Sequence, residues 1–506
     1  MTKPPVTTDQ SSDRASSRAT DRSFTGPLEP VDDCTWRIPK SYKPGMLVDG
    51  LIFADERLIP LLRSDRAPEQ VANVAFLPGI QQASLAMPDI HWGYGFCIGG
   101  VCATDPASGG VVSPGGVGYD INCGVRLVRT NLTLADVKPV LTQLVNQMIR
   151  DIPVGVGQGG NFVFSPDELR TLMREGVPFL ARQGLASADD IACTEAEGCI
   201  PGACPEYVSD RALARGADQC GTVGAGNHFI EVQVVDRVEN DTVAAAFGLH
   251  AGQICVLIHS GSRGLGYQVC DDALRALRDA PAKYGFDLPD RQLVCAPVES
   301  PEGKHYLGGM RAAANYAFCN RQLLMWHVRQ VFARIFGRSW EALDMQLLYD
   351  VAHNMAKIEE HAVGEARKDV CVHRKGATRA FPAGHHDIPE RYRHIGQPVI
   401  IPGDMGRASW VLVGGPRSLE RSFGTTCHGA GRCLSRTAAT KAAKGRNIRD
   451  ELLKESGVVA RCRSREGLAE EQPAAYKDVD VVVDVVHRAG LSLKVARLRP
   501  LGVIKG

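Results

Sequence analysis

Short apolar runs that end in glycine-rich turns recur from about residue 34 to the end of the chain. The runs "QICVLIH", which ends at His259, and "PVIIPG" have the length and β-branched content of buried strands. Between such runs, Leu141, Leu144, Val145 and Met148 keep a helical spacing. The pattern predicts a mixed α/β (α+β) fold with a central mixed sheet region.

The chain has 506 residues, enough for two or three domains at about 150 residues each. No low-complexity linker divides 34–506, and no period of about 20 to 50 residues repeats there. We therefore expect one large domain over 34–506. Residues 1–33 are rich in Ser, Thr, Asp and Arg and poor in large apolar side chains, which predicts a disordered tail.

Charge and hydropathy exclude several classes of protein. The formal net charge is +1, from 58 basic and 57 acidic residues, so binding to a polyanion must depend on local clusters of Lys and Arg. No apolar run approaches the roughly 18 residues that span a bilayer, and the N-terminal region is too acidic for a mitochondrial presequence. We expect no association with a membrane and a cytoplasmic and/or nuclear location.

The chain contains 16 cysteines without the regular framework of a small secreted scaffold. We expect reduced thiols, most of which fill space in the core. Four of them lie in one loop-like segment and could form a zinc site, although no CxxC pair occurs there. These four are Cys193, Cys199, Cys204 and Cys220.

Three histidines stand where apolar runs or glycine turns end: His228 in "GTVGAGNHF", His259 in "IHSGSRG" and His353 in "DVAHN". A single such histidine is more often hydrogen-bonded scaffolding than a ligand. With Asp120 and Cys123 of "GYDINCGVR", however, they offer carboxylate, thiolate and imidazole donors. That mixture suits Mn, Zn, Fe or Co better than Mg or Ca. The pattern predicts a two-metal site in which one thiolate could bridge both ions.

A second cluster, "SFGTTCHGAGR", places His428 among small residues and ahead of Arg432. Such a stretch allows a phosphate to approach the backbone closely while an arginine neutralises its charge. The basic segment "CLSRTAATKAAKGR" follows directly. The cluster therefore indicates phosphate chemistry, and the alternative is a turn that merely contains a histidine.

Nine strings occur in series between residue 87 and the last residue: "MPDIHWGYGF", "SPGGVGYDINCGVR", "GTVGAGNHF", "IHSGSRGLG", "DVAHN", "VHRKGATRAF", "TTCHGAGR", "AYKDVDVVV" and "LRPLGVIKG". In this order they resemble the RtcB family of GTP-dependent RNA-splicing ligases. The length and the opening "DDCTWRIPKSY" resemble the eukaryotic branch of that family. A series of long motifs is far more specific than any one short pattern.

The resemblance implies two Mn²⁺ ions, with Cys123 as the thiolate between them, and GTP as the nucleotide. It makes His428 the nucleophile that becomes guanylylated. The implied metal ligands are Asp120, Cys123, His228, His259 and His353.

The resemblance also implies a set of contacts to the guanylate. The set comprises Asn227, His228, Phe229, Ile230, Glu231, His353, Asn354, Pro402, Gly403, Asp404, Met405, Ser409, His428, Gly429, Ala430, Gly431 and Lys505. Asp404 would bring a carboxylate close to phosphates, so in the "PGDM" turn we expect contacts from the backbone. Charge and motif position suggest RNA phosphate contacts at Arg126, Arg263, Arg374, Lys375 and Arg432.

The implied activity joins RNA 3′-phosphate or 2′,3′-cyclic phosphate ends to 5′-hydroxyl ends through a histidine–GMP intermediate, in tRNA splicing and RNA repair. RNA, including tRNA exon halves, is the implied substrate, and subunits of a tRNA-ligase complex and archease are implied partners. Two alternatives stay open. A two-metal phosphoesterase acting on RNA ends would need the same cluster but no covalent nucleotide, and an inactive scaffold would have no chemical need for these motifs.

Overall fold

Two large sheets form the framework of the computed structural model, which describes residues 23–506. The first has seven strands in the order β1 (Glu29–Asp32), β2 (Thr35–Ile38), β3 (Asp49–Phe53), β4 (Ala83–His91), β5 (Ile98–Thr104), β13 (Ala366–Lys375) and β12 (Asn354–Val363). Neighbouring strands are antiparallel except for β3 and β4, which are parallel.

The second sheet follows the order β11 (Gln346–Ala352), β7 (Gly124–Thr133), β9 (Gln253–Ser260), β8 (Phe229–Val238), β19 (Ser492–Lys505), β16 (Ser409–Gly414) and β15 (Pro398–Ile401). An eighth strand, β18 (Val459–Cys462), pairs in parallel with β19. Its two end strands, β11 and β15, lie in contact, so the sheet curls until it is nearly closed. Val, Ile and Leu side chains of these strands form the largest hydrophobic cluster.

The remaining strands form two short sheets. In one, β6 (Val111–Val112) pairs with β10 (Ala296–Pro297), and in the other, β14 (Ala377–Arg379) pairs with β17 (Thr425–Cys427). The pair β14–β17 matters most for the site, because β17 also contacts β4 of the seven-stranded sheet. The residues that follow β17 are thereby brought between the two large sheets.

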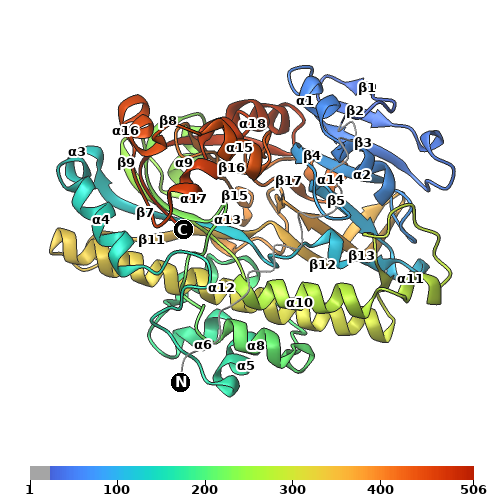
Figure 1. Cartoon of the computed structure of the whole chain (residues 1–506), viewed down its shortest axis with the longest axis horizontal. Helices are drawn as coiled ribbons and strands as arrows, with labels where there is room; N and C mark the ends of the chain where they lie inside the picture. The colour runs from blue at the N-terminus through green and yellow to red at the C-terminus, as the bar shows by residue number, and fades with distance from the viewer. Residues whose placement is uncertain (1–22) are drawn as a thin grey trace.

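Helices cover the sheets on their outer faces (Figure 1). They are α1 (Ile59–Ser64), α2 (Ala67–Val74), α3 (Leu134–Val137), α4 (Leu141–Asp151), α5 (Pro166–Glu175), α6 (Val177–Ala181), α7 (Ala188–Ala192), α8 (Asp210–Gly216), α9 (Asp241–Phe247), α10 (Arg263–Ala276), α11 (Ala280–Lys283), α12 (Pro301–Phe336), α13 (Glu390–Arg393), α14 (Ser418–Ser422), α15 (Arg436–Ala442), α16 (Ile448–Ser456), α17 (Arg465–Glu470) and α18 (Val479–Arg488).

The longest helix, α12, runs across the molecule below the sheets in Figure 1 and supports the site from beneath. Its start is fixed by Ser300, whose hydroxyl accepts the Gly303 N–H, and it ends at Gly337 in the left-handed conformation. The Arg321 guanidinium on α12 donates to the carbonyls of Asn122 and Ser260. The helix therefore holds the turn before β7 and the end of β9 in fixed positions.

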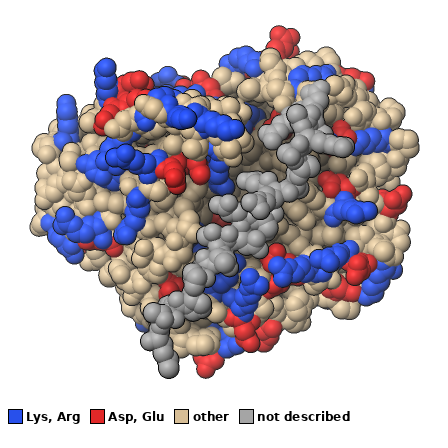
Figure 2. Space-filling model, viewed as in Figure 1, with Lys and Arg blue, Asp and Glu red and all other residues tan. Residues whose placement is uncertain are grey.

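The sequence prediction of a mixed α/β fold in a single large domain is confirmed. The predicted helical segment is α4, in which Leu144, Val145 and Met148 are buried. Within residues 23–506, no helix is both long and apolar enough to cross a membrane. On the face drawn in Figure 2, basic and acidic side chains are interspersed, which agrees with the small net charge.

The predicted disordered tail over 1–33 includes residues that are part of the fold. Phe24 is buried with its ring against Tyr42, and β1 pairs with β2 in the seven-stranded sheet. Asp32 also forms an ion pair with Arg421, far along the chain. Residues 1–22 lie outside the described part of the chain, so for them the prediction is untested.

The four cysteines considered for zinc do not come together. Cys193 and Cys220 are buried, while the Cys204 thiol donates to Glu206. Among residues 23–506, no convergent group of metal-ligand atoms contains any of the four, Cys199 included. The structure therefore gives no support to the zinc hypothesis, and all sixteen cysteines of the chain are free thiols.

Candidate active site

Four adjacent strands of the eight-stranded sheet deliver the predicted metal ligands to one edge. Cys123 immediately precedes β7 and His228 immediately precedes β8, while His259 is the penultimate residue of β9. His353 lies at the corner between β11 and β12. Because β11, β7, β9 and β8 are neighbours in this order, and Phe229 is in register with His259, the four side chains meet.

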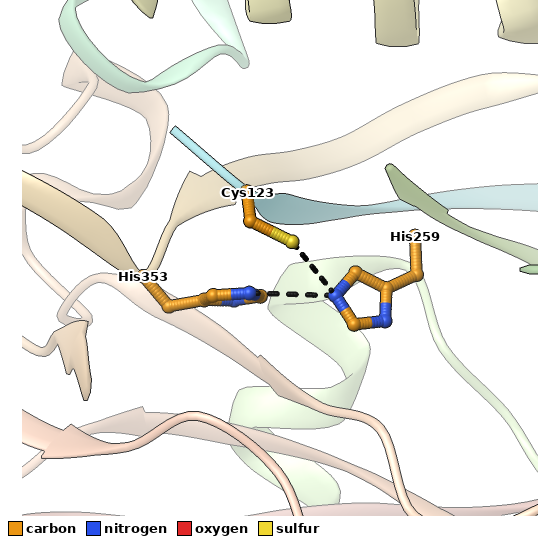
Figure 3. A group of neighbouring side chains, drawn as sticks. All are labelled: Cys123, His259 and His353. Atoms are coloured by element: carbon orange, nitrogen blue, oxygen red, sulfur yellow. Dashed lines mark hydrogen bonds between the residues drawn. The ribbon is translucent and has the colours of Figure 1, made fainter. Parts of the chain in front are cut away.

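Cys123, His259 and His353 point toward one another from three strands (Figure 3). The Cys123 Sγ lies 3.3 Å from His259 Nε2, and the two Nε2 atoms of His259 and His353 are also 3.3 Å apart. Both histidines are buried, and neither Nδ1 has a hydrogen-bond partner among the described residues. Three electron-pair donors that face one another in a buried space are the arrangement of ligands around a cation.

Asp120 and His228 form a second group with the same cysteine. His228 Nε2 lies 2.8 Å from Asp120 Oδ2 and 3.3 Å from Cys123 Sγ. The His228 Nδ1 lies 3.1 Å from the Val223 carbonyl and 3.4 Å from the Arg263 guanidinium. The shorter contact assigns the proton to Nδ1, which donates to that carbonyl and leaves Nε2 as the lone-pair donor. Cys123 belongs to both groups, so its sulfur is placed to bridge two ions.

The Asp120 carboxylate packs closely against the backbone of the segment that follows β9. Its Oδ1 accepts the Ser262 N–H at 2.9 Å. A side chain at Gly261 would collide with this carboxylate, since an added Cβ would stand 2.3 Å from Oδ1. The glycine after the strand that carries His259 is therefore required for the close approach of the two segments.

Charge and burial set the protonation of these ligands. Burial lowers the pKa of His259 and of His353 well below the usual value, so both imidazoles are neutral donors. Burial opposes ionisation of Asp120, but His228 and Arg263 outweigh it and lower the pKa of the carboxyl to about 2. Burial, and then the Asp120 charge, raise the pKa of the Cys123 thiol well above its ordinary value. A thiolate at Cys123 therefore needs a cation beside it.

His428 follows β17 and is not part of either metal group. Its Nδ1–H donates to Asp89 Oδ2 at 2.6 Å, and the same oxygen accepts the backbone N–H groups of His428 and Gly429. Nε2 keeps its lone pair and has no hydrogen-bond partner among residues 23–506, and the centroid of the ring lies 4.9 Å from that of the His353 ring. The geometry presents a nitrogen with an available lone pair next to the cluster of possible metal ligands.

The Asp89 carboxylate is held ionised inside the protein. Its side chain is fully buried, and burial by itself would raise its pKa, but His428 outweighs this effect and lowers the pKa below the ordinary value. Lys477 adds positive charge nearby, because its Nζ donates to the carbonyls of Pro88 and Ile90 on either side of Asp89. Asp89 can therefore stabilise a positive charge on the His428 ring.

Both features open into one cavity of about 260 Å³. Asp120, Cys123 and His259 line one side of it. Of the predicted guanylate contacts, those that line it are Asn227, Phe229, Glu231, His353, Asn354, Pro402, Gly403, Asp404, Met405, His428, Gly429, Ala430, Gly431 and Lys505. The structure thus brings together segments that are up to several hundred residues apart in the chain.

Lys505 is buried at the end of β19, between β8 and β18. Its Nζ stands 5.6 Å from the centre of the Phe229 ring and contacts the His228 carbonyl at 3.4 Å. Burial lowers the pKa of Lys505, while Glu471 opposes that shift. Burial, followed by the Asp404 charge, raises the pKa of Glu231 to about 8. This end of the cavity combines an aromatic face with an ammonium and carboxyl groups.

The Asp404 carboxylate is paired within its own turn, so it does not present an unpaired negative charge to a phosphate. It folds back onto its own turn, where Oδ1 accepts the N–H groups of Gly406 and Arg407, and its other oxygen pairs with the Arg407 guanidinium. Three predicted contacts do not line the cavity. His228 lies behind it, with its ring between the Val223 carbonyl and Cys123. The Ile230 side chain lies on the other face of β8 in the core, and the buried Ser409 hydroxyl accepts the N–H of Gly403.

Three of the five predicted RNA phosphate contacts are wrong. Arg126 is fully buried and paired with Asp350, Arg374 is buried and paired with Glu359, and Lys375 is buried with its Nζ on backbone carbonyls. The two others lie nearer the site. Arg432 lines the cavity, and the Arg263 side chain crosses the His228 turn so closely that an added Cβ at Gly224 would touch its guanidinium.

Sequence reasoning missed several side chains of the cavity. Asp89 and His91 lie in "MPDIHWGYGF", a string in which the sequence predicted no site residue. Other cavity-lining residues that were not predicted are Arg436, Glu471 and Tyr476. The contact between Asp89 and His428 joins positions 339 residues apart. A charged residue inside an apolar strand was the one local signal at Asp89.

Comparison with known proteins agrees with this geometry. A family model described as "tRNA-splicing ligase RtcB" matches residues 70–506. The chain is 52% identical over 484 residues to the tRNA-splicing ligase RtcB of Archaeoglobus fulgidus, covering 96% of this chain and 100% of that protein. It is 51% identical to that of Thermococcus kodakarensis, covering 95% and 99%. It is also 51% identical to the RNA-splicing ligase RtcB of Mycobacterium tuberculosis, covering 86% and 100%. The chain therefore belongs to the RtcB family.

Proposed function

We propose that this chain is a GTP- and Mn²⁺-dependent RNA ligase that joins RNA 3′-phosphate or 2′,3′-cyclic phosphate ends to 5′-hydroxyl ends. Relatives at about half identity carry the name tRNA-splicing ligase, which supports RNA as the substrate and tRNA splicing as the process. The observation that carries the proposal is the free Nε2 of His428, which faces the same cavity as a convergent cluster of metal-ligand atoms.

His428 would act as the nucleophile through Nε2. A bond from Nε2 to the α-phosphorus of GTP forms as the bond to the β-phosphate oxygen breaks and pyrophosphate leaves. No proton has to move in this step, because Nδ1 already carries one and donates it to Asp89. The ring becomes positively charged, and the buried Asp89 carboxylate stabilises that charge.

The joining steps first transfer the guanylate to one RNA end and then release it as GMP. A 3′-phosphate oxygen of one RNA takes the guanylate from Nε2, which restores the neutral imidazole held by Asp89. The 5′-hydroxyl of the second RNA then attacks that 3′-phosphate, a phosphodiester forms, and GMP leaves. Arg432, which lines the cavity and pairs with Glu471, would neutralise phosphate charge during these steps.

Two Mn²⁺ ions fit the donor set, with Cys123, His259 and His353 around one position and Asp120, Cys123 and His228 around the other. When bound, such ions polarise phosphoryl oxygens and neutralise charge in the transferring group. Mixed sulfur, nitrogen and oxygen donors also accept Zn, Fe or Co. Mn²⁺ is therefore tested by ligation with the metal-free protein and each ion in turn.

The chemistry of the nucleotide pocket supports GTP over ATP. Phe229 supplies a flat apolar face, and Glu231 supplies a buried carboxyl group that can accept hydrogen bonds. Guanine presents adjacent N–H donors on one edge, where adenine presents an acceptor and a single amino group. A carboxyl group beside the base, whose oxygens can accept from these N–H donors, therefore favours guanine.

The deciding experiment is incubation with α-³²P-labelled GTP and Mn²⁺, without RNA. We expect label on the wild-type chain, none on His428→Ala, and full label on His250→Ala, an exposed histidine outside the cavity. His428→Ala should still join an RNA whose 3′-phosphate already carries GMP. A wild-type chain that releases phosphate from RNA ends and takes no label would instead be a two-metal phosphoesterase.

A cytoplasmic and/or nuclear location and an interaction with archease and subunits of a tRNA-ligase complex belong to the same proposal. The proposed interactions rest on the resemblance to the family rather than on any surface of this chain. Fractionation of cells that produce the tagged protein tests the location. Co-purification with each named partner, with His428→Ala as a variant of unchanged surface, tests the interactions.

A further inference from the structure

Trp92 exposes a large apolar ring to solvent next to a residue of the active-site cavity. The residue follows directly after β4 and remains 46% exposed, although indole rings usually bury most of their surface. Its neighbour His91 is the last residue of β4, and the His91 side chain lines the cavity. Since consecutive Cα atoms lie about 3.8 Å apart, the backbone at Trp92 lies next to the cavity wall.

The backbone that carries Trp92 is fixed rather than loose. The buried Gln70 side chain on α2 accepts the Gly93 N–H at 3.0 Å and donates to the Gly93 carbonyl at 2.6 Å. A side chain at Gly93 would collide with the Phe96 carbonyl, so the chain must turn tightly there. A rigidly held, exposed aromatic ring loses little conformational entropy when a partner stacks on it.

Arg66 provides a positive charge at the same place. Its guanidinium carbon lies 5.6 Å from the centre of the Trp92 ring, and the side chain is exposed at the start of α2. Arg66 forms no ion pair with a carboxylate within the described residues, and the nearby Glu69 is paired with Lys43. An aromatic face with an uncompensated guanidinium beside it is the combination that binds a base and its phosphate in a single strand.

We propose that Trp92 and Arg66 form a stacking platform for a nucleobase of the RNA near the ends that are joined. The inference rests on the proposed ligase function and adds a determinant of RNA binding to it. The base stacks on the indole, and the Arg66 guanidinium contacts the adjoining phosphate. Because every base has an aromatic face, the platform binds a single-stranded end without requiring a particular sequence.

RNA binding by Trp92→Ala is the first test, measured with 3′-phosphate and 5′-hydroxyl single strands at fixed salt. We expect binding to weaken roughly 5- to 150-fold, the usual range for one stacked base, and Trp92→Phe to keep most of the affinity. Tyr207→Ala, which removes an aromatic ring of similar exposure elsewhere, should bind as the wild type does. Arg66→Ala should lower the slope of log affinity against log salt by about 0.7, the value for one phosphate.

The second test uses RNA that lacks one base at each of the three positions nearest the joined ends, on either strand. At the stacked position, removal of the base should weaken wild-type binding as much as Trp92→Ala does, and should cost that variant nothing more. Wild-type affinity in Trp92→Ala overturns the proposal. So does a loss that is the same at every abasic position, which would indicate a general change in shape.

GTP labelling without RNA separates this inference from the proposed function. Trp92→Ala should take the full guanylate label at the wild-type rate, because the ring is outside the nucleotide pocket. If the wild-type chain itself takes no label, the ligase function fails. If labelling is normal and RNA binding by Trp92→Ala is also normal, only the platform fails.

Discussion

Asp89 decides which nitrogen of His428 can react. As an acceptor it fixes the proton on Nδ1 and leaves Nε2 free, and its burial makes the pairing strong. The sequence predicted His428 from its glycine-rich surroundings but gave no indication of Asp89, because the contact forms only when β17 docks beside β4. The same limit explains Arg126, which pairs with Asp350 in the core although its motif looked like a phosphate site.

Asp89→Asn should abolish most guanylylation while the fold remains intact. An asparagine that keeps its oxygen at the Oδ2 position still accepts from Nδ1 and from the backbone N–H groups of His428 and Gly429, but it lacks the negative charge that stabilises a positively charged His428 ring. We expect the labelling rate with GTP to fall roughly 10²- to 10⁴-fold. Bound metal and melting temperature should stay near the wild-type values. Asp136→Asn, an exposed capping residue, serves as the control, and a labelling rate within a few fold of wild type would contradict the assignment.

Glu231→Gln should stabilise the fold and impair its use of GTP. Burial raises the pKa of Glu231 to about 8, so the unfolded chain loses this proton near its ordinary pKa while the folded chain keeps it. The resulting cost is absent below about pH 4.5 and complete above about pH 8. The melting temperature of the variant should therefore exceed that of the wild type by more at pH 8 than at pH 5. Equal differences at both pH values would show that Glu231 is not protonated in the fold.

Strand ends carry most of the chemistry at the level of elements. The sequence predicted this pattern, because apolar runs and glycine-rich turns marked the strand ends. At these ends lie His228, His259 and His353. It did not predict the strand order that makes them neighbours. The first strand was also missed, because β1 is short and mostly exposed and is held by pairing with β2. Short edge strands lack the apolar alternation that marks a strand in sequence.

Lys505→Met tests the role of β19 in the nucleotide pocket. Methionine keeps the buried volume at the strand end but removes the charge that lies beside Phe229. A charge-assisted hydrogen bond is worth about 1.5–3 kcal/mol, so the GTP concentration for half-maximal labelling should rise roughly 10- to 100-fold. The melting temperature should not fall, because burial already lowers the pKa of Lys505 and disfavours its charge. Lys494→Met on the same strand is the control, and labelling at wild-type GTP concentrations would show that Lys505 is only packed.

The whole molecule assembles its site from three sheets. The eight-stranded sheet supplies the metal ligands, the seven-stranded sheet supplies Asp89, and the β14–β17 pair supplies His428. Composition and motif order were sufficient to predict one mixed α/β domain, but not this docking, because it depends on packing between surfaces far apart in the chain. Bound metal therefore couples to the stability of the fold as well as to its chemistry.

Removal of metal with a chelator should lower the melting temperature by several degrees, and addition of Mn²⁺ should restore it in a concentration-dependent way. A ligand that binds only the folded state adds about 2.7 kcal/mol to the free energy of unfolding at a hundred times its Kd.

Since burial and Asp120 hold the pKa of the Cys123 thiol well above neutrality, metal binding must displace the thiol proton. Titration of the metal-free chain at pH 7 in weak buffer, with a pH indicator, should release about one proton from this residue as the site fills. Cys123→Ser should release none and bind metal at least roughly tenfold more weakly, because a serine hydroxyl does not ionise under these conditions and cannot serve both groups of ligands. A Cys123→Ser chain with wild-type metal content and proton release would show that the sulfur is a core residue and that the ions, if bound, are held elsewhere.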